Sequence, residues 1–116
     1  MSALGVEPEP PARLRLVRVS IPLVRAHRAA TGAEVRREVV LVGWVGGDGT
    51  VGWGECPTLQ GSGYVTEPTA TAWRALVEDL GPAVLRGGPL PTPVEGLLAA
   101  PSALADARLD HDLRRA

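Results

Sequence analysis

The strongest constraint in this chain is a change of hydrophobic pattern near residue 69. Before that point, a β-prone run over 36–45 is followed by Gly46-Gly47-Asp48-Gly49 and a second β-prone run over 50–55. An Asp-Gly pair between two such runs predicts a β-hairpin. After that point apolar residues recur at helical spacing, so the sequence predicts strands first and helices second.

A first strand is predicted ahead of the hairpin, over 13–24. Its apolar residues follow a two-residue period that places them on one face: Val17, Val19, Ile21 and Leu23. Arg18, Ser20 and Pro22 fall on the other face, with Pro22 near the strand end or on an edge. Residues 25–35 show no period and are predicted to form a loop, so the three strands form an antiparallel meander.

The helical part begins with an apolar stripe at positions i, i+3, i+4 and i+7: Trp73, Leu76, Val77 and Leu80. This spacing predicts an amphipathic helix that Thr69 or Thr71 can cap and that Gly81-Pro82 stops or kinks. A short helix is expected over 94–99, and a last helix from Pro101-Ser102 to Ala116. The predicted class is α+β, a three-stranded antiparallel meander followed by a small helical bundle.

Composition restricts the possible functions. The 116 residues indicate one domain, and a net charge of −1 gives no electrostatic case for nucleic acid or an anionic membrane as partner. All twelve basic residues are Arg, so no lysine base or Schiff base can form. The single Cys56 excludes an internal disulfide and is expected to be a small apolar filler. No secretory signal or apolar run of ~20 residues is evident, so a cytoplasmic location is expected.

Several polar and aromatic residues have both a functional and a structural interpretation, and the structural one is favoured. Glu55, at a strand end, is expected to accept backbone N–H bonds. Asp106, Asp110 and Asp112 could be interpreted as a cation site. They are expected to form a solvated helix face instead, because Asp112 points away from the other two. His27 and His111 lack a partner set for a site. The three tryptophans are expected in the core: Trp44, Trp53 and Trp73.

Five stretches, in order, resemble the N-terminal capping domain of the enolase superfamily, in its o-succinylbenzoate synthase and N-acylamino acid racemase branch (muconate-lactonizing-like). They are Ile21-Pro22-Leu23-Val24 leading to Arg28 and Thr31-Gly32; Val35-Arg36-Arg37-Glu38; Gly52-Trp53-Gly54-Glu55-Cys56 with Tyr64, Glu67 and Ala72-Trp73; Pro82-Ala83-Val84-Leu85; and Ala103-Leu104 through Leu113-Arg114. The resemblance spans about residues 14 to 116.

The resemblance implies a two-domain enzyme whose cap covers the mouth of a (β/α)-barrel. In that superfamily, barrel carboxylates hold Mg²⁺, which stabilises an enediolate, and a barrel lysine removes the proton beside a carboxylate. Branch members dehydrate a cyclohexadiene carboxylate for menaquinone synthesis or racemise N-acylated amino acids. This chain has neither lysine nor the ~250 residues of a barrel, so it is expected to hold no Mg²⁺ or catalytic residue and to be inactive alone.

By the same resemblance, the chain divides into a disordered lead-in (1–12), a capping domain (13–100) and the start of a helix linking to the absent barrel (101–116). The capping domain comprises a sheet (13–56), a lid loop (57–68) and helices (69–100). Four residues would contact a small carboxylate substrate as a lid: Arg28, Thr31, Gly32 and Tyr64. The loops that carry them could also be ordinary exposed turns. The alternative function is a stand-alone, non-catalytic binding or interaction module derived from the cap.

Overall fold

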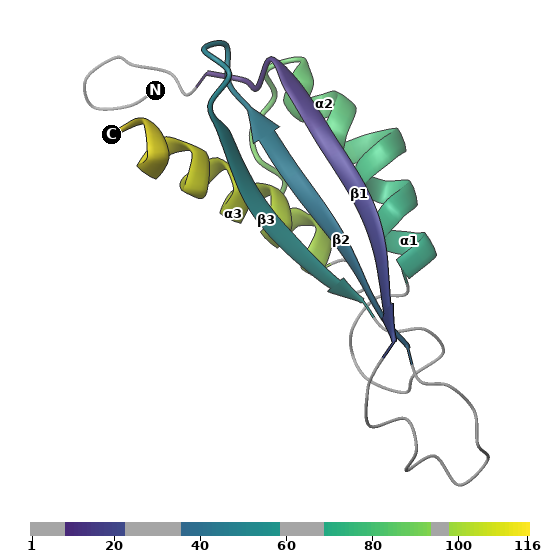
Figure 1. Cartoon of the computed structure of the whole chain (residues 1–116). Coiled ribbons are helices and arrows are strands. Elements are labelled where there is room, and N and C mark those ends of the chain that lie inside the picture. Colours follow the sequence, from purple (N-terminus) through teal and green to yellow (C-terminus); the bar gives the residue numbers. More distant parts are fainter. Residues whose placement is uncertain (1–8, 23–35, 59–68, 94–97) are drawn as a thin grey trace, which may run out of the picture.

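A computed structural model describes residues 9–22, 36–58, 69–93 and 98–116. Three antiparallel strands form one sheet in the order β1-β2-β3: β1 (Arg13–Pro22), β2 (Arg36–Val45) and β3 (Val51–Thr58). Helices follow the sheet in the sequence, which confirms the predicted α+β class (Figure 1). The bounds of β2 are those predicted, whereas β3 continues three residues past its predicted end.

The β2–β3 hairpin turns at the predicted Asp-Gly pair. Gly49 has a φ of 89°, a conformation that glycine adopts without steric cost. Its N–H donates to the Gly46 carbonyl at 3.0 Å, and Gly46 N–H donates to the Thr50 carbonyl at 2.9 Å. The Asp48 carboxylate accepts the Thr50 N–H at 3.0 Å. Turn chemistry therefore fixes the register of β3 on β2.

The first helical segment runs through Gly81-Pro82 instead of ending there. It consists of α1 (Thr69–Arg74), a π-helical turn η2 (Ala75–Leu80) and α2 (Gly81–Leu85). Pro82 has no N–H to give to the preceding turn, and the Gly81 N–H donates to the Leu76 carbonyl five residues back. The dipeptide thus widens the helix locally. Of the two candidate caps, Thr69 is the first residue of α1.

The second helical segment is one long helix, α3 (Ala99–Arg115), which begins two residues before its predicted start. Between α2 and α3, Gly87 has a φ of 89° and its N–H donates to the Val84 carbonyl, which ends α2 in the usual way. Of the short helix expected over 94–99, residues 94–97 lie outside the described residues and Ala99 belongs to α3.

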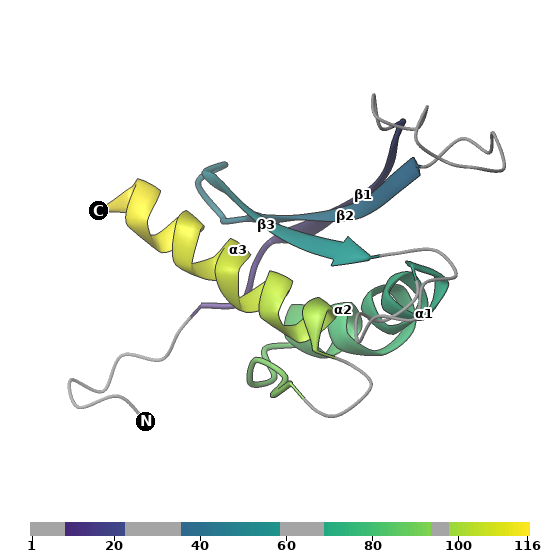
Figure 2. The same ribbon diagram turned by 90° about the horizontal axis from the view of Figure 1, so that it is seen from below.

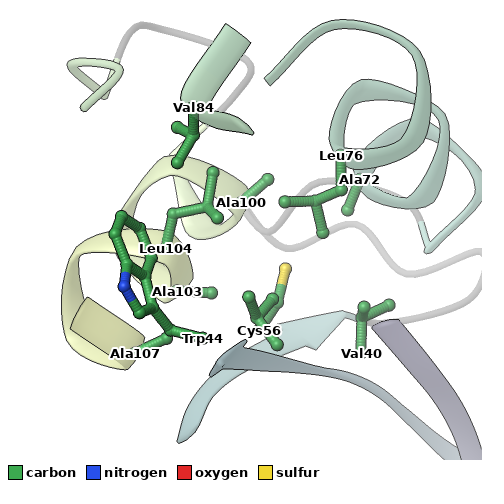
Figure 3. Packing of buried hydrophobic residues seen from close by; sticks show 11 residues of the cluster. Val40, Trp44, Cys56, Ala72, Leu76, Val84, Ala100, Ala103, Leu104 and Ala107 are labelled. Carbon is green, nitrogen blue, oxygen red and sulfur yellow. The ribbon is translucent and has the colours of Figure 1, made fainter. Parts of the chain in front are cut away.

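All described helices cover the same face of the sheet, here called the inner face (Figure 2). The core lies between the two layers, and Cys56 is fully buried in it, as expected of a small filler. Figure 3 shows the strand and helix residues converging there. The cluster consists of Val40, Val42, Trp44, Cys56, Ala72, Leu76, Val84, Ala100, Ala103, Leu104 and Ala107.

The predicted apolar face of β1 turns away from the helices. Leu14 and Leu16 pack on the core, whereas Val17 and Ile21, 37% and 46% exposed, lie on the opposite, outer face. Strand β1 carries apolar residues on both of its faces. The two-residue period therefore separates the two faces but cannot show which face the helices cover.

The prediction that all three tryptophans lie in the core is wrong for Trp53. Trp44 is buried and Trp73 packs against the core, but Trp53 is 37% exposed on the outer face. The guanidinium carbon of Arg15 lies 5.5 Å from the Trp53 ring centroid, within the range of a cation–π contact. Trp53 faces outward because Gly52 and Gly54, its neighbours along β3, face inward.

Gly52 and Gly54 allow α3 to lie directly on β3. A Cβ atom at Gly54 would collide with the carbonyl oxygen of Ala103, and one at Gly52 with the backbone of Ala107 and His111. Ala103 and Ala107 are fully buried on the facing side of α3. Small residues on both elements therefore bring the two backbones together. The boundary expected between the capping domain and the linking helix, at residue 100, falls inside α3.

We predict that Gly54→Ala lowers the free energy of unfolding by about 2–3 kcal/mol, because overpacking forces α3 away from the strand. Urea denaturation followed by circular dichroism measures the change. Gly47→Ala is the matched control, since an added Cβ there meets nothing within 4 Å, and it should shift stability by less than about 0.5 kcal/mol. Equal effects of the two substitutions would contradict the close-packing argument.

Candidate functional site

Both segments expected to form the lid begin and end at one end of the sheet, here called the loop end. Pro22, the last residue of β1, pairs with Arg36, the first of β2, across the first segment. The second segment follows Thr58, which pairs with Glu38, and precedes α1, which begins at Thr69 beside the same end (Figure 1). The lid residues themselves lie outside the described residues: Arg28, Thr31, Gly32 and Tyr64.

The inner face at the loop end carries an ion pair whose carboxylate is buried. Arg18 Nε lies 3.3 Å from Glu38 Oε1, and the side chains are 43% and 9% exposed. A carboxylate this buried needs a charged or hydrogen-bonding partner, and Arg18 supplies one. Glu38 is therefore paired with Arg18 across the two strands. The sequence placed Arg18 on the polar face but gave no sign that Glu38 would be its partner.

The expectation that Glu55 accepts backbone N–H bonds is wrong. Glu55 is exposed on the outer face of β3 and forms no hydrogen bond or ion pair with the described part of the chain. Strand β3 is an edge strand, so some of its N–H groups lack a neighbouring strand. Asp110 of α3 satisfies one of them, since the Trp53 N–H donates to its Oδ2 at 2.8 Å.

Asp110 is one of several residues that fasten the end of α3 to the hairpin. Its Oδ2 also lies 2.9 Å from Arg114 Nε, and Arg115 Nε lies 3.2 Å from Asp48 Oδ2 in the hairpin turn. The acidic cluster expected to be a solvated face is therefore partly structural. Among the described residues, no group of three or more His, Cys, Asp or Glu side chains is placed to hold a metal ion.

These contacts change the acidity of two carboxyl groups. The Arg114 side chain, and after it the Trp53 N–H, lower the pKa of Asp110 below its ordinary value of 3.8. The Thr50 backbone N–H, with a smaller contribution from Arg115, lowers the pKa of Asp48 below the same value. Both groups favour the charged form because hydrogen bonds and positive charge stabilise a carboxylate.

His111 is buried where α3 crosses the hairpin. Its Nδ1 lies 3.0 Å from Asp112 Oδ1, while Nε2 is buried without a hydrogen-bond partner in the described structure. A Cβ at Gly46 would collide with Nε2, so the ring is packed directly on the turn. The imidazole acts as a spacer between helix and hairpin.

A small hollow opens on the inner side beside Trp44, with a volume of about 80 Å³. Arg108 reaches its rim and lies 3.6 Å from Asp112. Pockets that bind organic ligands measure about 300–1,000 Å³, so this hollow is too small for a substrate site. It is lined by Glu9, Pro10, Trp44, Val84, Gly87, Gly88, Leu90 and Arg108.

The chain is similar to an N-succinylamino acid racemase from Amycolatopsis sp., with 36% identity over 109 residues. The match covers 87% of this chain and 29% of the relative, so the chain spans less than a third of that protein's length. The similarity supports an enolase-superfamily-like origin for this sequence. No family model matches the chain, and no solved structure matches it significantly. None of the helices in the described residues is long and apolar enough to span a membrane.

We predict that Asp110→Ala lowers the melting temperature, because it removes the acceptor of the Trp53 N–H and the partner of Arg114. A carboxyl group whose folded pKa is depressed stabilises the protein fully above its unfolded value of 3.8 and loses that contribution as pH falls through the folded value. The stability difference between wild type and variant should therefore be largest near pH 6 and shrink below about pH 4.

Thermal melts at several pH values measure this difference. Asp106→Ala removes an exposed carboxylate one turn earlier on the same helix and serves as the control, with little expected change at any pH. A constant difference for Asp110→Ala down to about pH 2 would show that its charge contributes nothing.

Proposed function

We propose that this chain is the capping part of an enolase-superfamily enzyme of the N-acylamino acid racemase and o-succinylbenzoate synthase branch. The similarity to an N-succinylamino acid racemase supports the family. The observation that carries the role is the common anchoring of both lid segments at the loop end of the sheet, between Pro22 and Arg36 and between Thr58 and Thr69. Two loops fixed at one edge can close over a single site.

In this proposal the cap excludes water and shapes the pocket around the substrate's distal end, while a barrel outside this sequence supplies the chemistry. The described residues do not fit Mg²⁺, since they offer no cluster of metal-ligating side chains and the buried carboxylate of Glu38 is paired with Arg18. We therefore assign no catalytic step to this chain. Its contribution is to bind and orient a small carboxylate through Arg28 and Tyr64.

The sharpest test replaces the matching segment of the Amycolatopsis racemase with this chain. We expect the chimera to exchange the α-proton of N-succinylated amino acids in D₂O with added Mg²⁺, as followed by NMR, and the isolated chain to show no exchange. Arg28→Ala in the chimera should raise KM by about tenfold, the usual loss of one charged contact. Arg86→Ala, which removes an exposed arginine after α2, is the control and should leave KM unchanged.

Exchange catalysed by the isolated chain would overturn the proposal that its chemistry lies elsewhere. A folded chimera without exchange would argue against the capping role. It would favour the second candidate, a stand-alone interaction module, which the uncovered apolar face of the sheet supports.

A further inference from the structure

The hollow beside Trp44 contains a polar group that the fold itself does not use. Trp44 is 3% exposed, yet no group in the described residues accepts a hydrogen bond from its indole N–H. Among the described side chains, His111 Nε2 is the one fully enclosed nitrogen or oxygen without a partner, so the Trp44 nitrogen is open to the hollow that its ring lines. Figure 3 shows this nitrogen on the side of the ring turned away from Cys56. A buried N–H without a partner marks a place for an acceptor from outside.

Two opposite charges line the same hollow. Arg108 of α3 supplies a guanidinium group, and its Nε lies 3.6 Å from Asp112 Oδ2, which is too long for a hydrogen bond. The N–H groups of Arg108 are therefore not committed to that carboxylate. Glu9, which precedes β1, supplies a carboxylate and forms no ion pair with the described part of the chain. The hollow thus offers one cation, one anion and one neutral N–H donor.

The volume of the hollow limits what it can hold. One water molecule needs about 10–15 Å³ of such space, and an engineered cavity of about 150 Å³ binds benzene. A volume of about 80 Å³ therefore accommodates roughly four to six non-hydrogen atoms. This is far smaller than an N-acylated amino acid and matches the size of glycine or alanine. Apolar side chains of Val84 and Leu90 form part of the wall.

We propose that this hollow binds a small zwitterionic α-amino acid. Its carboxylate accepts hydrogen bonds from the Arg108 guanidinium and the Trp44 N–H, and its ammonium group donates to the Glu9 carboxylate. A simple carboxylate would pair with Arg108 but lie beside Glu9, and a simple ammonium ion would lie beside Arg108. Only a ligand with both charges is complementary to both ends of the site. The inference is independent of the proposed enzyme family.

Two-dimensional ¹H–¹⁵N NMR of the full chain measures this binding, because the Trp44 indole peak reports the proposed contact. We expect glycine and alanine to shift that peak with a dissociation constant near about 1 mM, the affinity accessible to a ligand of about five non-hydrogen atoms. The indole peaks of Trp53 and Trp73, which do not line the hollow, should not move. Acetate and methylammonium each carry one of the two charges and should bind at least about tenfold more weakly.

Charge substitutions separate the two ends of the site. Glu9→Gln should weaken glycine about tenfold without weakening acetate, because only the ammonium group loses its partner. Arg108→Gln should weaken glycine at least about tenfold. Arg74→Gln removes an exposed arginine of α1 that does not line the hollow, so it is the control and should leave binding unchanged. Circular dichroism melts confirm that each variant folds.

A Trp44 peak that does not respond to glycine or alanine up to about 50 mM would overturn the proposal and show that the hollow holds water only. Acetate binding as tight as glycine binding would show that the hollow takes an anion alone, as would glycine binding that Glu9→Gln leaves unchanged. Either result would overturn the assignment of a zwitterion. An equal shift of all three indole peaks would indicate a general solvent effect and would overturn it as well.

Discussion

The structure depends on the direct contact between α3 and β3. A small open sheet of three strands is marginal in water unless another element covers a face. Helix α3 covers that face at short range, because Gly52 and Gly54 remove the side chains that would separate it from β3. The same approach brings Asp110 to the unpaired Trp53 N–H, so one contact buries the core and satisfies the strand edge. Close packing and polar satisfaction are thus achieved by the same pair of elements.

This contact gives a physical meaning to the Gly52-Trp53-Gly54-Glu55 stretch that resembles a superfamily pattern. The glycines face the helix, and the Trp and Glu side chains face away from it. The stretch therefore defines how a helix lies on a strand. A pattern of this kind can indicate a shared fold without carrying the reaction of the proteins that share it.

Local signals predicted the elements well. The hairpin followed from Asp48-Gly49 and the bounds of β2 from its β-prone run over 36–45, because turn conformation and β-propensity are properties of neighbouring residues. The misassigned residues are those whose role depends on a distant element. The sequence could not show that Asp110, fifty-seven residues from Trp53, would accept its N–H. It also could not show which apolar face of β1 the helices would choose, since Leu14 and Leu16 compete with Val17 and Ile21.

The two ends of the sheet therefore have different physical roles. At the hairpin end, two contacts tie the last turns of α3 to the strands: Asp110 with the Trp53 N–H and Arg115 with Asp48. At the loop end, the pair of Arg18 and Glu38 holds β1 against β2 just before both strands give way to the predicted lid segments. Loops that must rearrange around a substrate need fixed ends, or closure would distort the sheet. The Arg18–Glu38 pair contributes to such fixed ends, because it links β1 to β2 near the loop end through opposite charges, one of which is buried.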